Sequence, residues 1–323
     1  MKRPTSKTFY SANKIFLSHI QRHVEETTFI GYKTCANRIN SFLGDKRLVD
    51  MTTHDLFVFV NETLCQFTFP NGKIGYAKGS RENTASYLNL LFSHFFDKGE
   101  LKTNICASKI KVVGKDDRKS VRTYSDITIN ALKKSGSYLS LVALFGMSIG
   151  SRPSELVALT YSSIWIDMRG NTVLAINKAA PLGELKDTKN KSSMRIIVLS
   201  DDSIELLRKL LVKVGVTLEI VVKSRSKDHF LLINPKTCAR FGGSKKLYEC
   251  LRREFEQLEL DFHGVQACRH TFATRCANIG MPFEELAGYL GHSSTQMVKS
   301  LYIDKNSYAH GRNYQQFLCA AIN

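Results

Sequence analysis

The sequence lacks the short motifs that identify several common classes of enzyme. It has no G-x-x-x-x-G-K-[ST] phosphate loop, no H-E-x-x-H metal-binding pair and no G-x-S-x-G nucleophile turn. The segment 242–245 (GGSK) is suited to a phosphate, but the rest of a phosphate loop is missing. No grouping of Asp, Glu and His has the pattern of a two-metal nuclease. We therefore expect chemistry that uses neither a metal ion nor a nucleotide cofactor.

Signals for export and for membrane insertion are also missing. The eight cysteines form no C-x-x-C pair and show no zinc-type spacing with His, which is typical of a reduced intracellular protein. The basic residues near the first Met are not followed by the apolar region of a signal peptide. No apolar run reaches the ~18 residues that a membrane-spanning helix needs. We expect a cytoplasmic protein, associated with the nucleoid through DNA and not with a membrane.

What the sequence has in excess is positive charge. Lys and Arg number 46 against 29 Asp and Glu, a formal net charge of +17. The first 120 residues carry a net +8 and the remainder a net +9, so the excess is not confined to a basic tail. This distribution favours a polyanionic partner, most often nucleic acid. A basic enzyme that binds no polyanion and a binder of anionic membranes are the alternatives.

Apolar periodicity predicts two domains joined by a basic linker. Residues 1–105 are predicted to be a helical bundle, with helices over about 28–43, from an N-cap at Thr52, and around 88–95. Residues 106–122 are predicted to be the linker. Residues 123–323 are predicted to be a mixed domain with these elements: a helix over 139–147, a hairpin of 164–168 and 173–176, a strand over 194–199, a helix capped by Ser200 or Asp201, and a long helix around 247–258. The predicted fold class is mainly α with a small antiparallel β-sheet.

Four separate stretches contain the residues that are suited to phosphate chemistry. They are residues 146–156 (GMSIGSRPSEL), 188–199 (TKNKSSMRIIVL), 266–274 (QACRHTFAT) and 290–294 (LGHSS), with Tyr302 ten residues beyond His292. In this order they resemble the T-G-x-R-x-x-E-L, T-K-T-x-x-S-x-R-x-I-P-L, H-x-L-R-H-T-F-A-T and L-G-H-S-S…Y boxes of the tyrosine recombinases, the phage integrase family. The resemblance covers roughly residues 123–305, and residues 1–105 resemble the family's core-binding domain less specifically.

The resemblance implies that DNA strands are cut and rejoined through a 3′-phosphotyrosine, without ATP. Arg152 and Arg269 match the two arginines, whose donor forks suit the negative charge that spreads over the oxygens around phosphorus. By the same resemblance, His292 is a further donor to the phosphate and Tyr302 is the nucleophile. Only its spacing from His292 distinguishes Tyr302 from Tyr289 and Tyr308.

Two further positions complete the predicted site, and one departs from the family. Lys189 best matches the lysine that protonates the leaving 5′-oxygen, and Lys191 is the alternative. Glu155 matches a carboxylate that we interpret as structural, orienting Arg152 or the local backbone. The third box opens with Gln266 where the family has His. Glutamine can donate and accept hydrogen bonds, but it cannot act as a general base.

The resemblance also implies partners. These are double-stranded DNA recombination sites, a homo-tetramer assembled on the DNA and, in some systems, an accessory DNA-bending protein. The alternative enzyme is a type IB topoisomerase that acts on a single duplex. An alternative of another class is a DNA-binding protein without catalysis, with Gln266 as the first sign of a decayed site.

Overall fold

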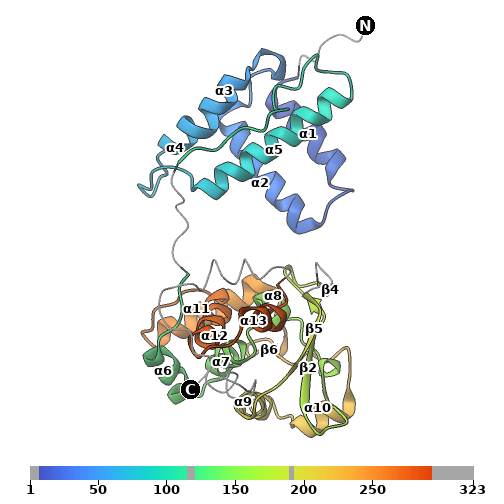
Figure 1. Ribbon diagram of the computed structural model, residues 1–323, viewed down its shortest axis with the longest axis vertical. Coiled ribbons are helices and arrows are strands. Elements are labelled where there is room, and N and C mark those ends of the chain that lie inside the picture. The colour runs from blue at the N-terminus through green and yellow to red at the C-terminus, as the bar shows by residue number, and fades with distance from the viewer. Residues whose placement is uncertain (1–6, 115–120, 189–192, 293–323) are drawn as a thin grey trace. The chain divides into compact units, whose positions relative to one another are not determined.

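The computed structural model describes residues 7–114, 121–188 and 193–292. Its contacts divide the chain into two compact units, Met1–Ser120 and Val121–Asn323. The described part of each unit is drawn in colour in Figure 1. The fold is mainly helical with small antiparallel sheets, which confirms the predicted fold class.

The first unit is built from helices packed around one apolar core. Its elements are α1 (Phe9–Ile20), α2 (Glu26–Leu43), a 3₁₀ turn (Leu48–Asp50), α3 (Thr53–Val58), a π-helical turn (Phe59–Thr63), α4 (Leu64–Gln66) and α5 (Lys78–Asp97). The predicted helix over 28–43 is α2, which ends before Gly44. Thr52 caps α3 as predicted, because its side chain accepts from the Asp55 amide while the Asp55 carboxylate accepts from the Thr52 amide.

A small polar network lies inside this apolar core. Asn13 is almost fully buried on α1. Its amide nitrogen donates to Asn40 of α2 at 2.7 Å, and its amide oxygen accepts from the Tyr87 hydroxyl of α5 at 3.0 Å. Since an unpaired buried amide would cost about 1–3 kcal/mol, these bonds specify how the three helices meet.

Part of the segment predicted to be a linker packs on the first unit. Ile110 and Val112 lie against its apolar core. The Asn61 side chain donates to the Lys111 carbonyl at 3.0 Å and accepts from the Val113 amide at 2.7 Å. Residues 110–113 therefore form an edge of this unit.

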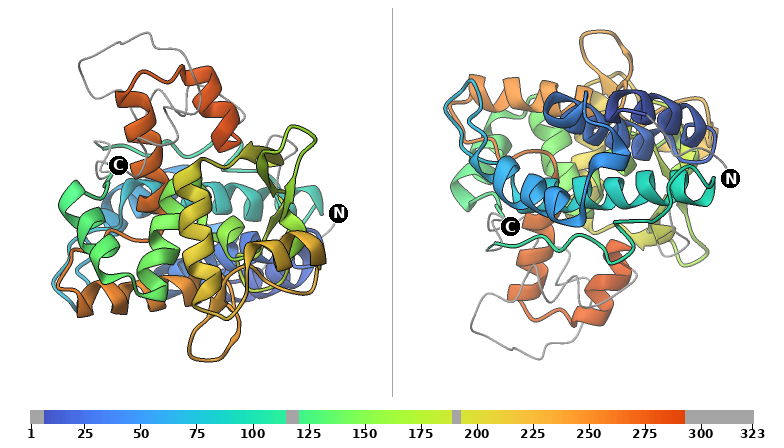
Figure 2. Two further views of the ribbon diagram at one scale, coloured as in Figure 1. Left: turned by 90° about the horizontal axis from the view of Figure 1, so that it is seen from below. Right: turned by 90° about the horizontal axis from the view of Figure 1, so that it is seen from above.

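The second unit combines helices with short strands. The helices are α6 (Asp126–Ser135), α7 (Tyr138–Ile149), α8 (Pro153–Leu156), α9 (Asp201–Val212), α10 (Leu218–Ser224), α11 (Ser244–Gln257), α12 (Gln266–Asn278) and α13 (Phe283–Leu290), with a 3₁₀ turn at Tyr161–Ser163. The strands are β1 (Ile164–Ile166), β2 (Thr172–Ile176), β3 (Lys178–Ala179), β4 (Lys186–Asp187), β5 (Arg195–Val198), β6 (Ile233–Asn234) and β7 (Ala239–Arg240). Figures 1 and 2 show β2 and β5 on one side of this unit and α6, α7, α11 and α12 on the other.

The predicted hairpin and the predicted third strand form one sheet. Its strand order is β1-β2-β5, with Ile164 opposite Leu174 and Ile176 opposite Arg195. The hairpin turn is organised by the Asp167 carboxylate, which accepts from the amides of Arg169 and Asn171. Strands β3 and β4 pair with each other in a separate two-stranded sheet.

Helix α7 lies at the centre of the second unit. Its apolar sequence is buried on every side, as expected for a helix that is covered all round. Ser137 caps its start, and Gly150 ends it with a φ of 58°. Helices α6, α9, α11 and α12 all pack against it. The end of α7 therefore brings residues 150–152 against α12, where the candidate site lies.

Replacing Gly150 tests this close approach. A Cβ at Gly150 would lie 2.6 Å from Cδ1 of the buried Phe272 ring, at a φ that L-residues rarely adopt. We expect Gly150→Ala to lower the free energy of unfolding of the second unit by about 2–4 kcal/mol, from strain and overpacking together. Trp165, the single tryptophan, lies in β1, so its fluorescence during urea unfolding reports on this unit.

Gly170→Ala is the matched control. Gly170 has a φ of 82°, and no atom lies within 4 Å of an added Cβ. This variant should lose only about 1 kcal/mol, from backbone strain alone. Equal losses in the two variants would contradict the packing of Phe272 against the end of α7.

Candidate active site

Arg269 is anchored inside the second unit by main-chain oxygens. It lies in α12 and is only 1% exposed. Its Nη1 donates to the Gly150 carbonyl at 3.0 Å, and its Nη2 donates to the Leu290 carbonyl at 2.7 Å. Carbonyl oxygens compensate for the loss of water without neutralising the guanidinium, so the positive charge is retained.

Arg152 reaches the same region from a different element. It precedes α8 as its N-cap, and its side chain is 32% exposed. Its Nη1 donates to Glu155 Oε1 at 2.6 Å, while its Nη2 lies 3.3 Å from the Gly291 carbonyl. Arg152 and Arg269 therefore both contact the segment 290–291 at the end of α13.

A buried carboxylate joins the arginines. Glu155 is 2% exposed, and its Oε2 accepts from the Arg152 amide and from Arg195 Nη2, each at 2.9 Å. Arg269 Nη1 lies 4.0 Å from the same oxygen. Burial raises the pKa of Glu155, but the hydrogen bond and charge of Arg195 and then those of Arg152 outweigh it, so the pKa is lowered. Glu155 is therefore ionised, and it orients Arg152 as the sequence predicts.

His292 closes the cluster. Its Nε2 lies 2.6 Å from Arg269 Nη2, and a guanidinium can only donate, so Nε2 is the acceptor and the ring proton lies on Nδ1. Burial and then the charges of Arg269, Arg152 and Arg195 lower the pKa of His292 to about 4, against a smaller opposing effect of Glu155. The imidazole is therefore neutral at physiological pH.

Several buried polar atoms in these four sequence stretches lack a protein partner. Within the described residues they are Ser151 Oγ, Thr188 Oγ1, Arg195 Nε and His292 Nδ1. Buried donors without a partner are costly, and those of Ser151 and His292, next to Arg152 and Arg269, can be satisfied by a bound oxygen-rich group such as a phosphate. Together with the surplus of guanidinium charge, they make the region suited to an anion.

The remaining predicted site residues are placed differently. Gln266 is exposed at the first position of α12, one turn before Arg269. Lys189, its alternative Lys191, Tyr302 and Tyr308 lie outside the described residues. The structure thus brings together Arg152, Arg269 and His292 and leaves the other assignments as predictions.

Tyr289 and His263, the alternatives to predicted site residues that the structure describes, both pack against aromatic rings. Tyr289 stacks on Phe272 with ring centroids 5.0 Å apart, and burial raises the pKa of its hydroxyl. His263, which lies near Gln266 in sequence, stacks on Tyr124 at 5.4 Å. Both aromatic pairs are contacts of the apolar core.

Sequence reasoning did not assign a role to Arg195. Its signal was present, because the second stretch matches the family box at this arginine. An arginine at the start of a short strand is usually exposed, however, and only the pairing of β5 with β2 places this one beside Glu155.

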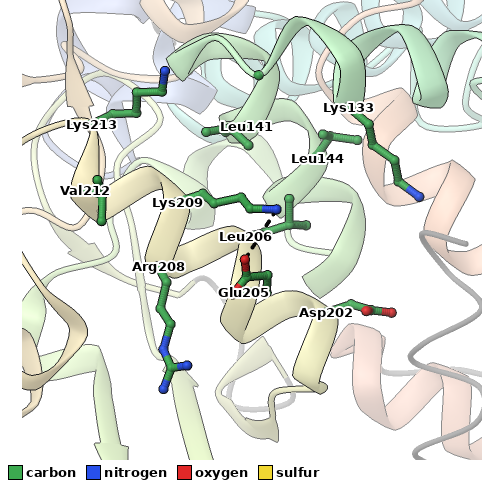
Figure 3. Close-up of a pocket in the computed structure, with 11 residues that line it drawn as sticks. Lys133, Leu141, Leu144, Asp202, Glu205, Leu206, Arg208, Lys209, Val212 and Lys213 are labelled. Carbon is green, nitrogen blue, oxygen red and sulfur yellow. Dashed lines mark ion pairs between the residues drawn. The ribbon is translucent and has the colours of Figure 1, made fainter.

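A hollow elsewhere in the second unit is separate from this cluster. It has a volume of about 590 Å³ and lies between α9 and the residues around the α6–α7 turn (Figure 3). Leu141, Leu144 and Leu206 contribute its apolar lining, and the Lys209–Glu205 ion pair lies within it. None of the candidate site residues lines it. Among the described residues, no group of three or more His, Cys, Asp or Glu side chains could hold a metal ion, and no helix is long and apolar enough to cross a membrane.

The structure therefore defines a protein with a mainly helical second unit that carries an arginine cluster suited to an anion. The model of the phage integrase family matches residues 117–308, more than half of the chain. The chain therefore belongs to the phage integrase family.

Curated relatives and solved structures agree with this membership. The chain is 23% identical to a "Tyrosine recombinase XerC-like" protein of Caldanaerobacter subterraneus over 254 residues, which are 70% of this chain and 63% of that protein. It is 21% identical to an "Integrase" of Streptomyces ambofaciens over 301 residues, 87% of this chain and 71% of that one. The chain thus spans less than two thirds of the first relative's length.

Two solved structures share the fold. The Tn1549 transposon integrase in complex with transposon right end DNA has a TM-score of 0.69 at 16% identity, covering 93% of this chain and 96% of that chain. A lambda integrase dimer bound to a COC′ core site has a TM-score of 0.65 at 18% identity, covering 96% and 81%. At this identity the likeness establishes the fold.

The surroundings of His292 make a prediction about acid stability. Its pKa in the folded protein, about 4, lies below that of a free histidine, about 6.5, so the unfolded chain binds more protons between these values. The stability associated with the neutral ring is present above about pH 6.5 and is lost as the pH falls toward 4. We expect the wild type to lose more stability between pH 7 and pH 5 than His292→Gln, whose amide oxygen can still accept from Arg269.

Urea unfolding followed by Trp165 fluorescence at both pH values measures this difference. Acid effects from Glu155 and other carboxylates are common to the two proteins and cancel in the comparison. The same loss of stability in the wild type and the variant would show that His292 is not held neutral by the arginines.

Proposed function

We propose that this chain is a site-specific DNA recombinase that cuts and rejoins DNA strands through a 3′-phosphotyrosine at Tyr302, and that it integrates or excises a mobile element. The observation that best supports the proposal is the convergence of Arg152, Arg269 and His292 around the buried carboxylate of Glu155. If each arginine were paired with its own carboxylate, the arginines would serve only the fold. Among the described residues, three guanidiniums face one carboxylate here, and this surplus of positive charge suits a phosphate.

The proposed reaction follows from the charge that develops at phosphorus. The Tyr302 hydroxyl gives its proton to water as its oxygen bonds to phosphorus, the bond from phosphorus to the 5′-oxygen breaks, and a proton from Lys189 goes to that leaving oxygen. Arg152 and Arg269 stabilise the negative charge on the non-bridging oxygens. The phosphotyrosine retains the energy of the phosphodiester bond, so the 5′-hydroxyl of a second strand can reverse the step without ATP.

His292 has a defined part in this scheme. Its ring accepts from Arg269 in the described structure. A phosphate beside the arginines would take over the guanidinium donors and bring negative charge to the imidazole, which favours a ring nitrogen that donates. His292 would then contribute a hydrogen bond to the phosphate.

The substrate and the assembly are part of the same proposal. Solved integrases with this fold are described as bound to DNA, and lambda integrase is described as a tetramer bound to a Holliday junction. We propose double-stranded recombination sites as the substrate, a homo-tetramer on the DNA as the active assembly, an accessory DNA-bending protein in some reactions, and a cytoplasmic, nucleoid-associated location. The net charge of +17 supports salt-sensitive binding to phosphates.

Covalent trapping tests the proposed reaction. A nicked duplex that carries the junction of the encoding element is incubated with the wild type or with Tyr302→Phe in EDTA, and adducts are resolved on a denaturing gel. Nicking lets the short fragment diffuse away, so the phosphotyrosine accumulates. We expect an adduct with the wild type and none with Tyr302→Phe, although both bind the duplex equally.

Each other outcome points to a different function or to a different nucleophile. Binding without an adduct in either protein would contradict the proposed recombinase and favour a DNA-binding protein without catalysis. Adducts accompanied by relaxation of plasmid DNA but no strand exchange would favour a topoisomerase. An adduct that persists in Tyr302→Phe would assign the nucleophile to another tyrosine.

Gln266 makes a second prediction about the same reaction. It is exposed one helical turn before Arg269 and has no titratable group. Gln266→His should raise the rate of adduct formation at pH 8 by up to about tenfold, because an imidazole can take the tyrosine proton. The gain should disappear as the pH falls below about 6.5, where the imidazole is protonated.

Gln266→Ala is the control for the position. It should be slower than the wild type at every pH, because the hydrogen bonds of the amide are lost. If the His variant shows no gain at any pH, the Gln266 position does not face the nucleophile.

A further inference from the structure

Arg195 is an unusual arginine because it is buried although it starts a strand. Its side chain is 6% exposed. Nη1 donates to the Ser193 carbonyl at 3.0 Å, and Nη2 donates to Glu155 Oε2 at 2.9 Å. A buried guanidinium needs compensation of this kind, and breaking such a pair is strongly destabilising. Arg195 thus joins β5 to the carboxylate that also holds Arg152.

The two oxygens of Glu155 are divided among their donors. Oε1 accepts from Arg152 Nη1 at 2.6 Å. Oε2 accepts from the Arg152 amide and from Arg195, both at 2.9 Å. Because Oε2 is already occupied, Arg152 cannot form the two-pronged pair that arginine and carboxylate usually prefer. The second terminal nitrogen of Arg152 is left with a long contact of 3.3 Å to the Gly291 carbonyl.

The charge balance also depends on Arg195. Within the part of the chain that the structure describes, Arg152, Arg195 and Arg269 lie around one ionised carboxylate, while His292 is neutral. Without Arg195, Glu155 would offset the charge of Arg152 directly and pull both of its terminal nitrogens inward. With Arg195, Glu155 can position Arg152 while the cluster keeps a surplus of positive charge.

We propose that Arg195 is a positioning residue of the recombination reaction. By sharing Glu155 Oε2, it keeps one arm of Arg152 available for the scissile phosphate, and it does not touch the phosphate itself. This inference rests on the proposed function, and it assigns a role to a residue beyond the predicted arginines, lysine, histidine and tyrosine.

Three substitutions test the proposal in the full chain. Arg195→Met keeps the apolar stem and removes the donors, Arg195→Lys keeps the charge and one donor position, and Lys209→Met removes an exposed ion pair of α9 as the control. The single-turnover rate of adduct formation on the nicked duplex and the affinity for that duplex are measured separately. Arg195→Met should slow adduct formation about 10- to 100-fold, as expected for a misplaced catalytic group.

The other readouts separate positioning from stability alone. Affinity for the duplex should change by less than about threefold, since most phosphate contacts remain. Arg195→Lys should recover at least about tenfold of the lost rate, and Lys209→Met should match the wild type. Trp165 fluorescence establishes that each variant is folded at the temperature of the assay.

A pH profile gives a signature that a merely structural role would not produce. Losing Arg195 removes the leading influence that lowers the pKa of Glu155 against burial. The carboxylate of Arg195→Met should therefore protonate at a higher pH than in the wild type, and the cleavage rate should show an additional decline on the acid side. Adding Arg195→Met to Glu155→Gln should lower the cleavage rate by less than about a further threefold, because both changes act through the same carboxylate oxygen.

The results that would overturn the proposal are distinct from failure of the proposed function. A rate like that of the wild type in Arg195→Met, or full additivity with Glu155→Gln, would show that Arg195 does not act through the carboxylate. If even the wild type forms no adduct, the proposed function fails. The effect of Arg195 on Arg152 is then measured by how much inorganic phosphate stabilises the second unit against unfolding, followed by Trp165 fluorescence. Arg195→Met should need about tenfold more phosphate than the wild type, and an unchanged requirement would contradict the proposal.

Discussion

The buried carboxylate of Glu155 joins distant segments of the second unit at the candidate site. Glu155 is ionised at 2% exposure, which is unfavourable unless charged donors surround it. Arg152 and Arg195 supply the hydrogen bonds, and Arg269 adds its charge from 4.0 Å. These arginines come from the N-cap of α8, from β5 and from α12, so the same interaction that compensates Glu155 also fixes three distant segments in one place. The fold and the candidate site therefore share one electrostatic centre.

The two predicted arginines of the pair are held in different ways, and this difference suits them to an anion. Arg269 is fully buried and is oriented by the carbonyls of Gly150 and Leu290, which are neutral and leave its charge intact. Arg152 is one-third exposed and is held by Glu155, with only a long contact of 3.3 Å from its second terminal nitrogen to the Gly291 carbonyl. A rigid arginine beside an accessible one can bind a phosphate with little rearrangement. Such preorganised donors are the condition for electrostatic stabilisation of a transition state. His292, whose pKa is lowered to about 4 beside the arginines, is neutral.

Local sequence signals predicted much of the fold. The Thr52 and Ser200 caps, the helix over 28–43 and the hairpin of 164–168 and 173–176 all follow from residues a few positions apart. The two-residue strands β3, β4, β6 and β7 could not be predicted, because strands so short have no periodicity. The role of Arg195 was missed for a related reason, since its partner Glu155 lies forty positions earlier and only the register of β5 on β2 brings them together. The assignments of Lys189 and Tyr302 remain predictions that rest on the family boxes.

If the arginine cluster neutralises the charge of the scissile phosphate, a substrate without that charge should need the cluster much less. Adduct formation by the wild type and by Arg152→Ala is compared on a nicked duplex with a normal scissile phosphate and on one with a methylphosphonate there, which lacks the negative charge. We expect Arg152→Ala to lose at least about 100-fold in rate on the phosphate and to come within about tenfold of the wild type on the methylphosphonate. An equal loss on both substrates would show that Arg152 does not act on the charge of the phosphate.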